Sequence, residues 1–296
     1  MKQRNNQNHP IYPAQRSVQD RLLSVLYGTT AGRLLLRPLV SPCFSRLGGW
    51  LLNTRLSSLA VKPFVRTNKI DLSMCETQTF SSYNAFFTRK LRPDARPLDP
   101  DPKAWISPCD ARLSVFPVTR DGQFWVKHTP YTLGELLGDQ TLAKRFEGGT
   151  LWLYRLCVDD YHRYIYPDHG LKSHNVHIPG IFHTVNPIAN DRYPIYKENT
   201  REYCLLKTQN FGTVLMMEVG AMLVGKIENQ EKGSAWVRRG EEKGNFAFGG
   251  STILLVTQAG RVVPETAFSP SVTPQKEQRV RMGERTGYAG KNCPDA

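Results

Sequence analysis

The pattern of apolar positions divides the chain into two parts with different periodicities. Between residues 18 and 59, apolar side chains recur at the three- and four-residue spacing of amphipathic helices. Glycines and prolines interrupt this pattern and predict several short helices rather than one long helix: Gly28, Gly32, Pro38, Pro42 and the pair Gly48-Gly49. Residues 1–17 are polar and are predicted to form a disordered tail.

A further short amphipathic helix is predicted over residues 81–91, and the proline-rich stretch 92–100 ends it as a linker. After this point the pattern favours strands. Apolar and β-branched runs predict strands at 111–118, 151–158, 171–178, 202–206, 213–219 and 253–256, with short helices at 131–138 and 142–146. The predicted fold class is α+β. A helical, membrane-associating region over residues 18–100 would precede a β-rich catalytic domain over residues 101–296.

Charge is concentrated in the helical region. The whole chain carries a formal net charge of +13. Residues 1–70 contribute eleven Lys or Arg and one acid, Asp20, so this segment holds 11 − 1 = +10. Arginines beside leucines and a tryptophan are typical of helices that lie in an anionic membrane interface. The alternative is a helical subdomain packed on the core with a solvated arginine face, and both interpretations can hold together.

Other partner and compartment classes are not favoured. No recognised nucleic-acid-binding module occurs, so nucleic acid is not a predicted partner. No apolar run reaches the roughly 18 residues of a membrane span, and no secretory segment follows Met1. The chain is therefore predicted to be peripheral to the cytoplasmic side of the cell membrane. The six cysteines form no CxxC pair and are expected to be free thiols. A homodimer is left open.

The stretch Gly249-Gly250-Ser251-Thr252 precedes the apolar run that ends at Val256. Glycine permits backbone geometry that other residues resist and leaves its carbonyl open to approach. A hydroxyl held against the preceding carbonyl is the arrangement needed for an N-to-O acyl shift, in which Ser251 attacks the carbonyl of Gly250. The same four residues are also typical of an ordinary tight turn before a strand, and the local pattern leaves both interpretations open.

Two further clusters carry candidate chemistry. Asp110 stands at the entry to a predicted strand, where it could orient a histidine or simply pair with Arg112 in a turn. His162 is a candidate acid or base because its charge changes near neutral pH. Arg163 could bind a phosphate or carboxylate. The alternative for His162 and Arg163 is a hydrogen-bonded aromatic cluster under a loop.

A metal centre and a nucleotide cofactor are both disfavoured. Five histidines lie within 22 residues, but their spacing matches no zinc-binding scheme, so no metal is predicted: 162, 169, 174, 177 and 183. No phosphate-binding loop motif occurs either, which leaves no sequence signal for a nucleotide.

Taken in order, these motifs resemble phosphatidylserine decarboxylase, most closely the shorter bacterial type found in clostridia. The likeness covers residues 20 to 290 and rests on these stretches: Phe86-Phe87-Thr88-Arg89-Lys90-Leu91, Ala95-Arg96-Pro97, Ser107-Pro108 with Asp110, Asp160-Tyr161-His162-Arg163-Tyr164, Val185-Asn186-Pro187-Ile188-Ala189, Arg201-Glu202-Tyr203, Met217-Glu218-Val219-Gly220-Ala221 and Arg239-Gly240-Glu241-Glu242-Lys243-Gly244 through Phe248-Gly249-Gly250-Ser251-Thr252.

The resemblance implies a pyruvoyl enzyme made by self-cleavage. Ser251 would attack Gly250, and elimination would divide the precursor into a β chain, residues 1–250, and an α chain, residues 251–296. Ser251 would become an N-terminal pyruvoyl group. Its carbonyl would react with the amine of phosphatidylserine and accept electrons while CO2 leaves, giving phosphatidylethanolamine. The implied catalytic residues are Ser251, Asp110 and His162.

One position departs from the family pattern. The family usually has His-x-x-His, in which the second histidine joins the aspartate and the serine as the base for self-cleavage. Here the first histidine is His162, but Ile165 occupies the second position. Three interpretations follow. The precursor matures with another base such as His162 or His169, or slowly without one; or the protein is a lipid-binding relative that does not mature; or the mature enzyme acts on a soluble amino acid.

Overall fold

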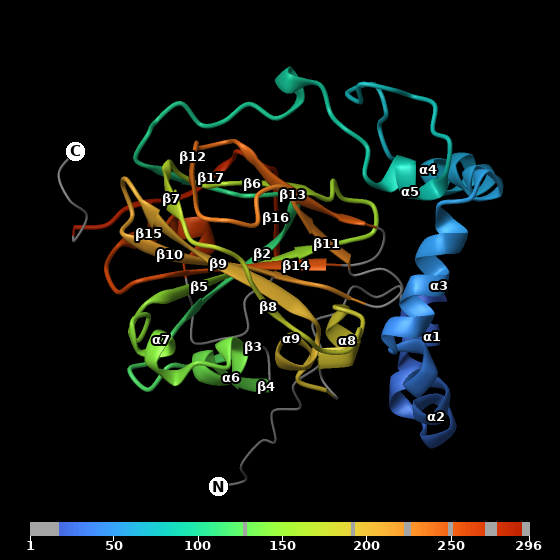
Figure 1. The fold of residues 1–296 in the computed structure, drawn as a ribbon, viewed down its shortest axis with the longest axis horizontal. Coiled ribbons are helices and arrows are strands. Elements are labelled where there is room, and N and C mark those ends of the chain that lie inside the picture. The colour runs from blue at the N-terminus through green and yellow to red at the C-terminus, as the bar shows by residue number, and fades with distance from the viewer. Residues whose placement is uncertain are drawn as a thin grey trace, which may run out of the picture.

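The computed structural model describes residues 18–126, 129–190, 193–221, 226–247, 251–269 and 277–291. Within these residues a large antiparallel sheet forms the centre of the molecule (Figure 1). Its strands in spatial order are β12 (Ala235–Val237), β7 (Gly170–Lys172), β9 (Arg201–Thr208), β10 (Thr213–Val219), β14 (Ser251–Thr257), β5 (Thr150–Leu156), β2 (Ala111–Pro117) and β16 (Gln278–Val280), and β8 (Val176–Ile178) also pairs with β9.

Strand β14 occupies the middle of this sheet. It pairs with β10 on one side and β5 on the other, and all of its residues are buried. Ile253 and Leu255 face one hydrophobic core, while Leu254 and Val256 face another. This alternation follows from the two-residue period of a strand. A strand buried on both faces reads in the sequence as a continuous apolar run, which is why residues 253–256 were recognisable.

Two small sheets cover the face of the central sheet to which Ile253 and Leu255 point. One consists of β1 (Ala104–Ile106), β17 (Arg285–Ala289) and β15 (Val262–Pro264). The other consists of β11 (Lys226–Asn229), β13 (Glu242–Ala247) and β6 (Arg163–Ile165). Their inward side chains, including Trp105 and Tyr164, join the residues of the central sheet in one core.

Short helices and a two-stranded hairpin cover the opposite face (Figure 1). They are the hairpin β3 (Gln123–Val126) with β4 (Thr129–Thr132) and the helices α6 (Leu133–Leu137), α7 (Gln140–Lys144), α8 (Pro187–Asn190) and α9 (Ile195–Glu198). Two single turns, η2 (Pro93–Ala95) and η3 (Thr266–Phe268), complete the described body. The α+β class with a β-rich core is therefore confirmed.

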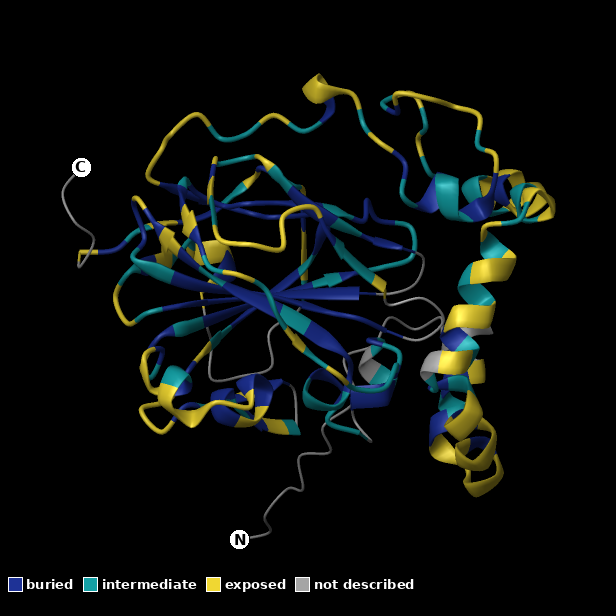
Figure 2. Ribbon diagram, viewed as in Figure 1, coloured by how far each residue is buried: buried dark blue, intermediate teal, exposed yellow. Residues whose placement is uncertain are grey.

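The N-terminal helices stand along one side of this body, and we call them the helical arm (Figures 1 and 2). They are α1 (Val18–Gly28), α2 (Thr30–Leu39), α3 (Pro42–Leu52), η1 (Arg55–Ala60), α4 (Val61–Asn68) and α5 (Tyr83–Phe87). The breaks predicted at Gly28, Gly32 and Pro42 lie at or near helix ends, and Pro38 is accommodated in the last turn of α2. The break predicted at Gly48-Gly49 is wrong, because α3 continues through both glycines to Leu52. None of the described helices is long and apolar enough to span a bilayer.

The arm is attached to the body through buried side chains of α1 and α2. Tyr27 is fully buried, and its hydroxyl lies 3.2 Å from Nδ1 of His183. The same oxygen accepts a hydrogen bond of 3.2 Å from the amide of Thr184. Leu23 and Leu36 add apolar contacts to the core beneath the central sheet.

Three predicted elements differ most from the structure, and the helix expected over 142–146 is shifted to Gln140–Lys144. The run 171–178 forms two strands, because the side chains of Ser173 and Asn175 bond to neighbouring chain segments and interrupt the ladder. The helix expected over 131–138 begins only at Leu133, where Thr132 caps it by accepting from the amide of Glu135. The helix expected over 81–91 ends at Phe87. The predicted tail, residues 1–17, lies outside the described residues.

Candidate active site

Ser251 is the first residue of β14 and lies at the end of the central sheet, fully buried. Its side chain shares the face of Ile253 and so points toward the core between the central sheet and the sheet of β6 and β13. Gly249 and Gly250 precede it and lie outside the described residues, so the predicted scissile bond is known from its serine side only.

His162 is the partner of Ser251. It immediately precedes β6, and its Nδ1 lies 3.1 Å from Oγ of Ser251 although 89 residues separate the two in sequence. The backbone holds it there, because its carbonyl accepts a hydrogen bond of 3.0 Å from the amide of Phe246 on β13. Both side chains are fully buried. The fold therefore brings together two of the three predicted catalytic residues.

The hydrogen bond made by Nε2 of His162 determines whether Nδ1 carries a proton. Nε2 lies 2.8 Å from the carbonyl oxygen of Cys157, which can only accept a hydrogen bond. Nε2 therefore carries the proton, and Nδ1 presents a lone pair to the hydroxyl of Ser251. Burial, helped by the positive charge of Arg89, lowers the pKa of His162 to about 3. The imidazole is consequently neutral near pH 7 and in the tautomer that a base requires.

Helix α5 covers this pair from the side of the helical arm. The ring of Phe87 lies over the imidazole of His162, with 4.1 Å between the ring centroids. Phe87 belongs in turn to a cluster with Val61, Phe64 and Phe86, which joins α4 to α5. The arm thus forms one wall of the candidate site, and this wall excludes water from the histidine.

Asp110 does not contact His162. Its carboxylate accepts two hydrogen bonds from Nε of Arg96, at 2.8 and 3.1 Å, and one of 2.5 Å from Nη2 of the same side chain. The amide of Met282 donates a further bond of 2.8 Å. The expected orientation of a histidine by Asp110 is not the arrangement in the structure, and neither is the alternative pair with Arg112, which instead contacts the sulfur of Cys157.

Ile165 lies in apolar surroundings. Its side chain packs in a small cluster with Ala104 and Ile106 of β1, and the partly buried Met282 lies against the same cluster. Its amide donates to the carbonyl of Pro108, at 2.9 Å. The side chains packed around Ile165 in this cluster are therefore apolar.

Comparison with known proteins identifies the relatives of the chain. A family model described as phosphatidylserine decarboxylase matches residues 83–288. Phosphatidylserine decarboxylase proenzyme 2 of Clostridium acetobutylicum is 38% identical and covers 92% of this chain and 94% of its own length. The phosphatidylserine decarboxylase proenzymes of Ruminiclostridium cellulolyticum and Clostridium botulinum (strain Kyoto / Type A2) are 37% and 34% identical. They cover 98% and 93% of the chain, and 97% and 95% of their own lengths. The chain belongs to the phosphatidylserine decarboxylase family.

Within this family, the relay implied by the resemblance would run through Asp110, residue 165 and Ser251. In this member the aspartate is bound to Arg96, residue 165 is apolar, and the serine is bound to His162. Of the alternative bases, His169 lies elsewhere, with Nδ1 3.3 Å from the amide of Arg239.

Arg163 was predicted to bind substrate, but its guanidinium is already committed. Nη1 donates to Glu242 at 2.5 Å, and Nε and Nη2 donate to the carbonyls of Thr88 and Arg89. These bonds fasten β6 to β13 and to the segment after α5. We therefore assign Arg163 a structural contact in place of substrate binding.

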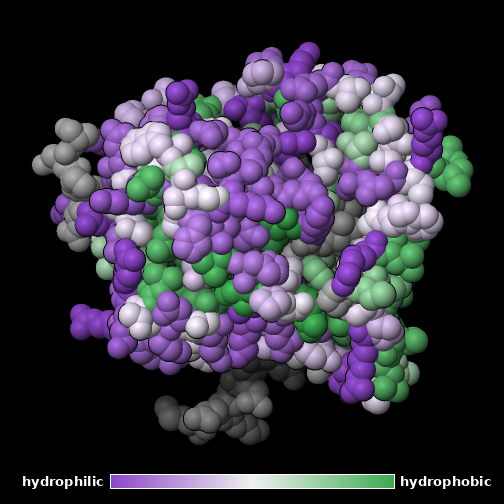
Figure 3. All heavy atoms as spheres, in the orientation of Figure 1, coloured by the Kyte–Doolittle hydropathy of each residue, from purple (hydrophilic) through white to green (hydrophobic). Residues whose placement is uncertain are grey.

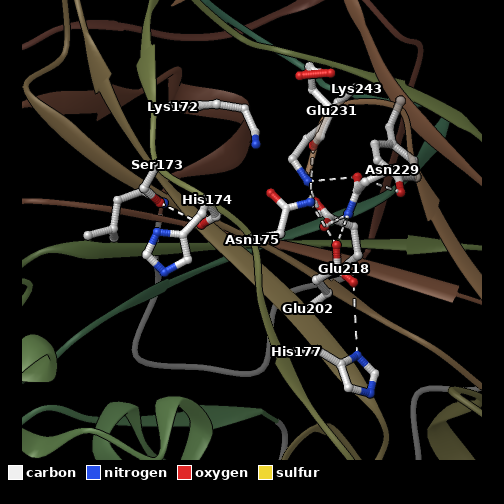
Figure 4. A network of polar contacts seen from close by, with 12 residues as sticks. Lys172, Ser173, His174, Asn175, His177, Glu202, Glu218, Asn229, Glu231 and Lys243 are labelled. Atoms are coloured by element: carbon white, nitrogen blue, oxygen red, sulfur yellow. Dashed lines mark hydrogen bonds and ion pairs between the residues drawn. The ribbon is translucent and has the colours of Figure 1, made fainter. Parts of the chain in front are cut away.

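A buried polar network that no sequence motif indicated links the central sheet to β13 (Figure 4). Nζ of Lys243 lies 2.7 Å from Oε2 of Glu218 and 2.8 Å from Oδ1 of Asn229, and the side chains of Lys243 and Glu218 are fully buried. Asn229 also donates to Glu202, at 2.7 Å. The network therefore anchors β13, which is the strand that leads to the residues before Ser251.

Among the described residues, one group combines ligand atoms at the spacing a metal would need: Cys157, Asp159 and Asp160. The guanidinium groups of Arg155 and Arg112 contact the sulfur of Cys157, at 3.2 and 3.3 Å. Two cations at the sulfur disfavour a third. The cysteines of the described chain are free thiols, as predicted: Cys43, Cys75, Cys109, Cys157 and Cys204.

Proposed function

We propose that this chain is the precursor of a pyruvoyl enzyme that converts phosphatidylserine to phosphatidylethanolamine at an anionic membrane surface. The observation that carries the proposal is the buried contact between Nδ1 of His162 and Oγ of Ser251. It supplies a serine activated for self-cleavage in a family whose relatives are named as proenzymes.

Self-cleavage would proceed as an N-to-O acyl shift. Nδ1 of His162 takes the proton of Oγ, the oxygen of Ser251 bonds to the carbonyl carbon of Gly250, and the amide C–N bond breaks. The proton then passes to the freed amine. Loss of the α-proton of Ser251 expels the carboxylate of Gly250, and addition of water releases ammonia and leaves a pyruvoyl group.

The residues around Ser251 fit such a group. A pyruvoyl carbonyl would capture the substrate amine and take up the electron pair released when CO2 departs. Nδ1 of His162 could return to the substrate carbon only a proton that it has first taken up, for example from the substrate amine, and Phe87 keeps water from the imidazole. Arg163 and Glu242 hold β6 against β13 and so fix the position of His162.

The helical arm supports attachment to a membrane. The described arm exposes several large apolar side chains: Leu22, Val25, Leu34, Leu35, Leu47, Trp50, Leu51, Leu56 and Leu59. Exposed arginines lie among them, and the surface of the arm accordingly mixes hydrophobic and hydrophilic residues (Figure 3). An apolar surface of this kind, with cationic groups beside it, suits an anionic lipid interface. We propose peripheral attachment to the cytoplasmic face of the cell membrane.

One experiment tests the chemistry directly. Purified protein is analysed on a denaturing gel and by intact mass, and CO2 release from phosphatidylserine is measured. Two fragments that match residues 1–250 and 251–296 are expected, and Ser251→Ala should give one chain of 33.6 kDa. An uncut wild-type chain would favour a lipid-binding relative without catalysis. A cut chain that releases CO2 only from a soluble amino acid would contradict the proposed substrate.

A further inference from the structure

Arg89 is a buried cation without an anionic partner. Only 6% of the residue is exposed, and no carboxylate among the described residues lies within ion-pair distance of its guanidinium. Its two hydrogen bonds to oxygen are long, at 3.4 Å each, to the backbone carbonyls of Phe86 and Asp160. Nε has no partner at all. A buried charge is costly unless it is paired and hydrogen-bonded.

Arg201 shows what a buried arginine with a structural role looks like in the same molecule. It is 5% exposed, and it donates to four backbone carbonyls at distances between 2.7 and 3.3 Å, those of Leu136, Lys197, Asn199 and Glu135. Each of its three nitrogens has a partner. Arg89 lacks such a set of acceptors, so its guanidinium keeps donors free for a ligand.

The anions near Arg89 are occupied by other groups. The carboxylate of Asp110, whose charge acts on Arg89, is bound by Arg96. The thiol of Cys75 also contacts Arg89, but burial raises the pKa of that thiol, so it stays neutral. The guanidinium therefore has no counter-charge of its own.

The position of Arg89 places this free cation at the candidate active site. Its Nη2 contacts the carbonyl of Asp160, two residues before His162. Phe87, two residues before Arg89, lies over the ring of His162. Displacement of this one segment would expose the histidine and the guanidinium together.

We propose that Arg89 binds the phosphodiester group of the lipid substrate, an inference that rests on the proposed function. The phosphodiester keeps its charge throughout the reaction, so an ion pair with it positions the headgroup equally in the ground and transition states. An ion pair with the departing carboxylate would instead stabilise the ground state, because that charge is lost as CO2 forms, and would slow the reaction. A planar guanidinium suits two oxygens of a phosphate.

The test uses cleaved protein and two competitive inhibitors that separate the two anions. Glycerophosphoethanolamine carries a phosphodiester and no carboxylate, and L-serine carries a carboxylate and no phosphate. Arg89→Met should raise the inhibition constant of glycerophosphoethanolamine at least about tenfold, as expected for loss of a charged hydrogen bond. The constant for L-serine should stay within about twofold. KM for phosphatidylserine should rise, with kcat nearly unchanged.

Arg89→Lys keeps the positive charge but loses the planar guanidinium that can bind two oxygens. Its inhibition constant for glycerophosphoethanolamine should therefore lie between those of Arg89→Met and wild type. If Arg89→Met does not fold, Arg89→Lys is used for the test. Arg92→Met is the matched control, because Arg92 lies on the same segment with an exposed side chain paired to Asp94. Weaker inhibition by L-serine alone would assign Arg89 to the carboxylate, and unchanged constants for both inhibitors would make it structural. Either result overturns the proposal. A wild-type chain that is not cut or releases no CO2 would contradict the proposed function itself, and this is measured first.

Discussion

The β body and the helical arm use similar side chains in opposite ways. Leu255 on β14 is fully buried between two sheets, whereas Leu35 on α2 is 64% exposed. The body contains a fully buried ion pair, Lys243 with Glu218, while the described arm carries exposed arginines and no acid with a described side chain before Asp71. The body thus buries its large apolar strands within its own core and contains Ser251 and His162. The arm leaves large apolar side chains exposed, which a second surface such as a membrane could cover. The arm also contacts the candidate active site through Phe87.

This comparison is most sharply tested at His162, where the largest effect is expected. His162→Gln keeps hydrogen-bonding atoms but removes the base, so self-cleavage should slow by about a hundredfold or more. Binding to vesicles should not change, because the arm is untouched. The cleaved fraction is followed with time on a gel, with the exposed His174→Gln as control. Cleavage at the wild-type rate would show that the base lies elsewhere.

The next prediction concerns membrane binding by the arm and compares two tryptophans that are equally exposed. Trp50 on the arm and Trp236 on the body are both 65% exposed. Trp50→Ser should weaken binding to phosphatidylserine-containing vesicles by about tenfold at low salt, since an interfacial aromatic group is lost, and should leave self-cleavage unchanged. Trp236→Ser should alter neither. Equal losses in a vesicle co-sedimentation assay would remove the distinction between arm and body, and so would equal binding to neutral vesicles.

The junction between the two regions should respond to pH. Burial lowers the pKa of His183 to about 4 in the folded protein, where Tyr27 and Glu198 face its ring. Its unfolded value is about 6.5, so between these values the unfolded state binds more protons. Stability is therefore complete above about pH 6.5 and is lost as the pH falls toward 4.

The loss from His183 should amount to about 1.4 kcal/mol per pH unit between pH 6 and 4.5. His162 adds a change of the same sign. Asp160, whose pKa burial raises to about 6, adds one of opposite sign, and both cancel when variants are compared. Denaturant unfolding of His183→Gln should thus show a shallower pH dependence than wild type by that amount. Parallel curves would mean that His183 does not titrate as described.

The smallest effect is expected at Ile165. Ile165→His restores the family residue, but the aspartate that should orient it stays bound to Arg96, and the new ring would be buried among Ala104 and Ile106. The cleaved fraction should remain within about twofold of wild type, at a stability cost of about 1–3 kcal/mol. Substantially faster cleavage would show that Asp110 can exchange Arg96 for a histidine.

Much of the fold and part of the site could be predicted from local patterns. The apolar run after Ser251 predicted the central strand. A strand buried on both faces has apolar residues at successive positions, so it stands out in the sequence as a continuous apolar run. Gly28 and Pro42 marked ends of arm helices, whereas Pro38 and Gly48-Gly49 lie inside helices. Ser251 and His162 were recognised because each lies in a compact motif of reactive residue types.

The remaining features depend on which side chains the fold brings together. Arg96 lay in a stretch predicted only as a linker, and nothing local indicated that it would bind Asp110. Arg163 was predicted to bind an anion and Arg89 was not singled out, and only the contacts show that the guanidinium of Arg163 is hydrogen-bonded to Glu242 while Nε of Arg89 has no partner. The break between β7 and β8 also escaped prediction, because Ser173 and Asn175 act through hydrogen bonds to residues far along the chain.

The central place of β14 has a consequence for the mature protein. A cut before Ser251 would leave the fragment 251–296 contributing a strand hydrogen-bonded on both edges, to β10 and to β5, inside the other fragment. Such a pair is an obligate heterodimer whose interface is the hydrophobic core of a single fold. Dilution should not separate the two fragments, and neither should be soluble alone. Dissociation and global unfolding would be one event, with a midpoint that depends on protein concentration.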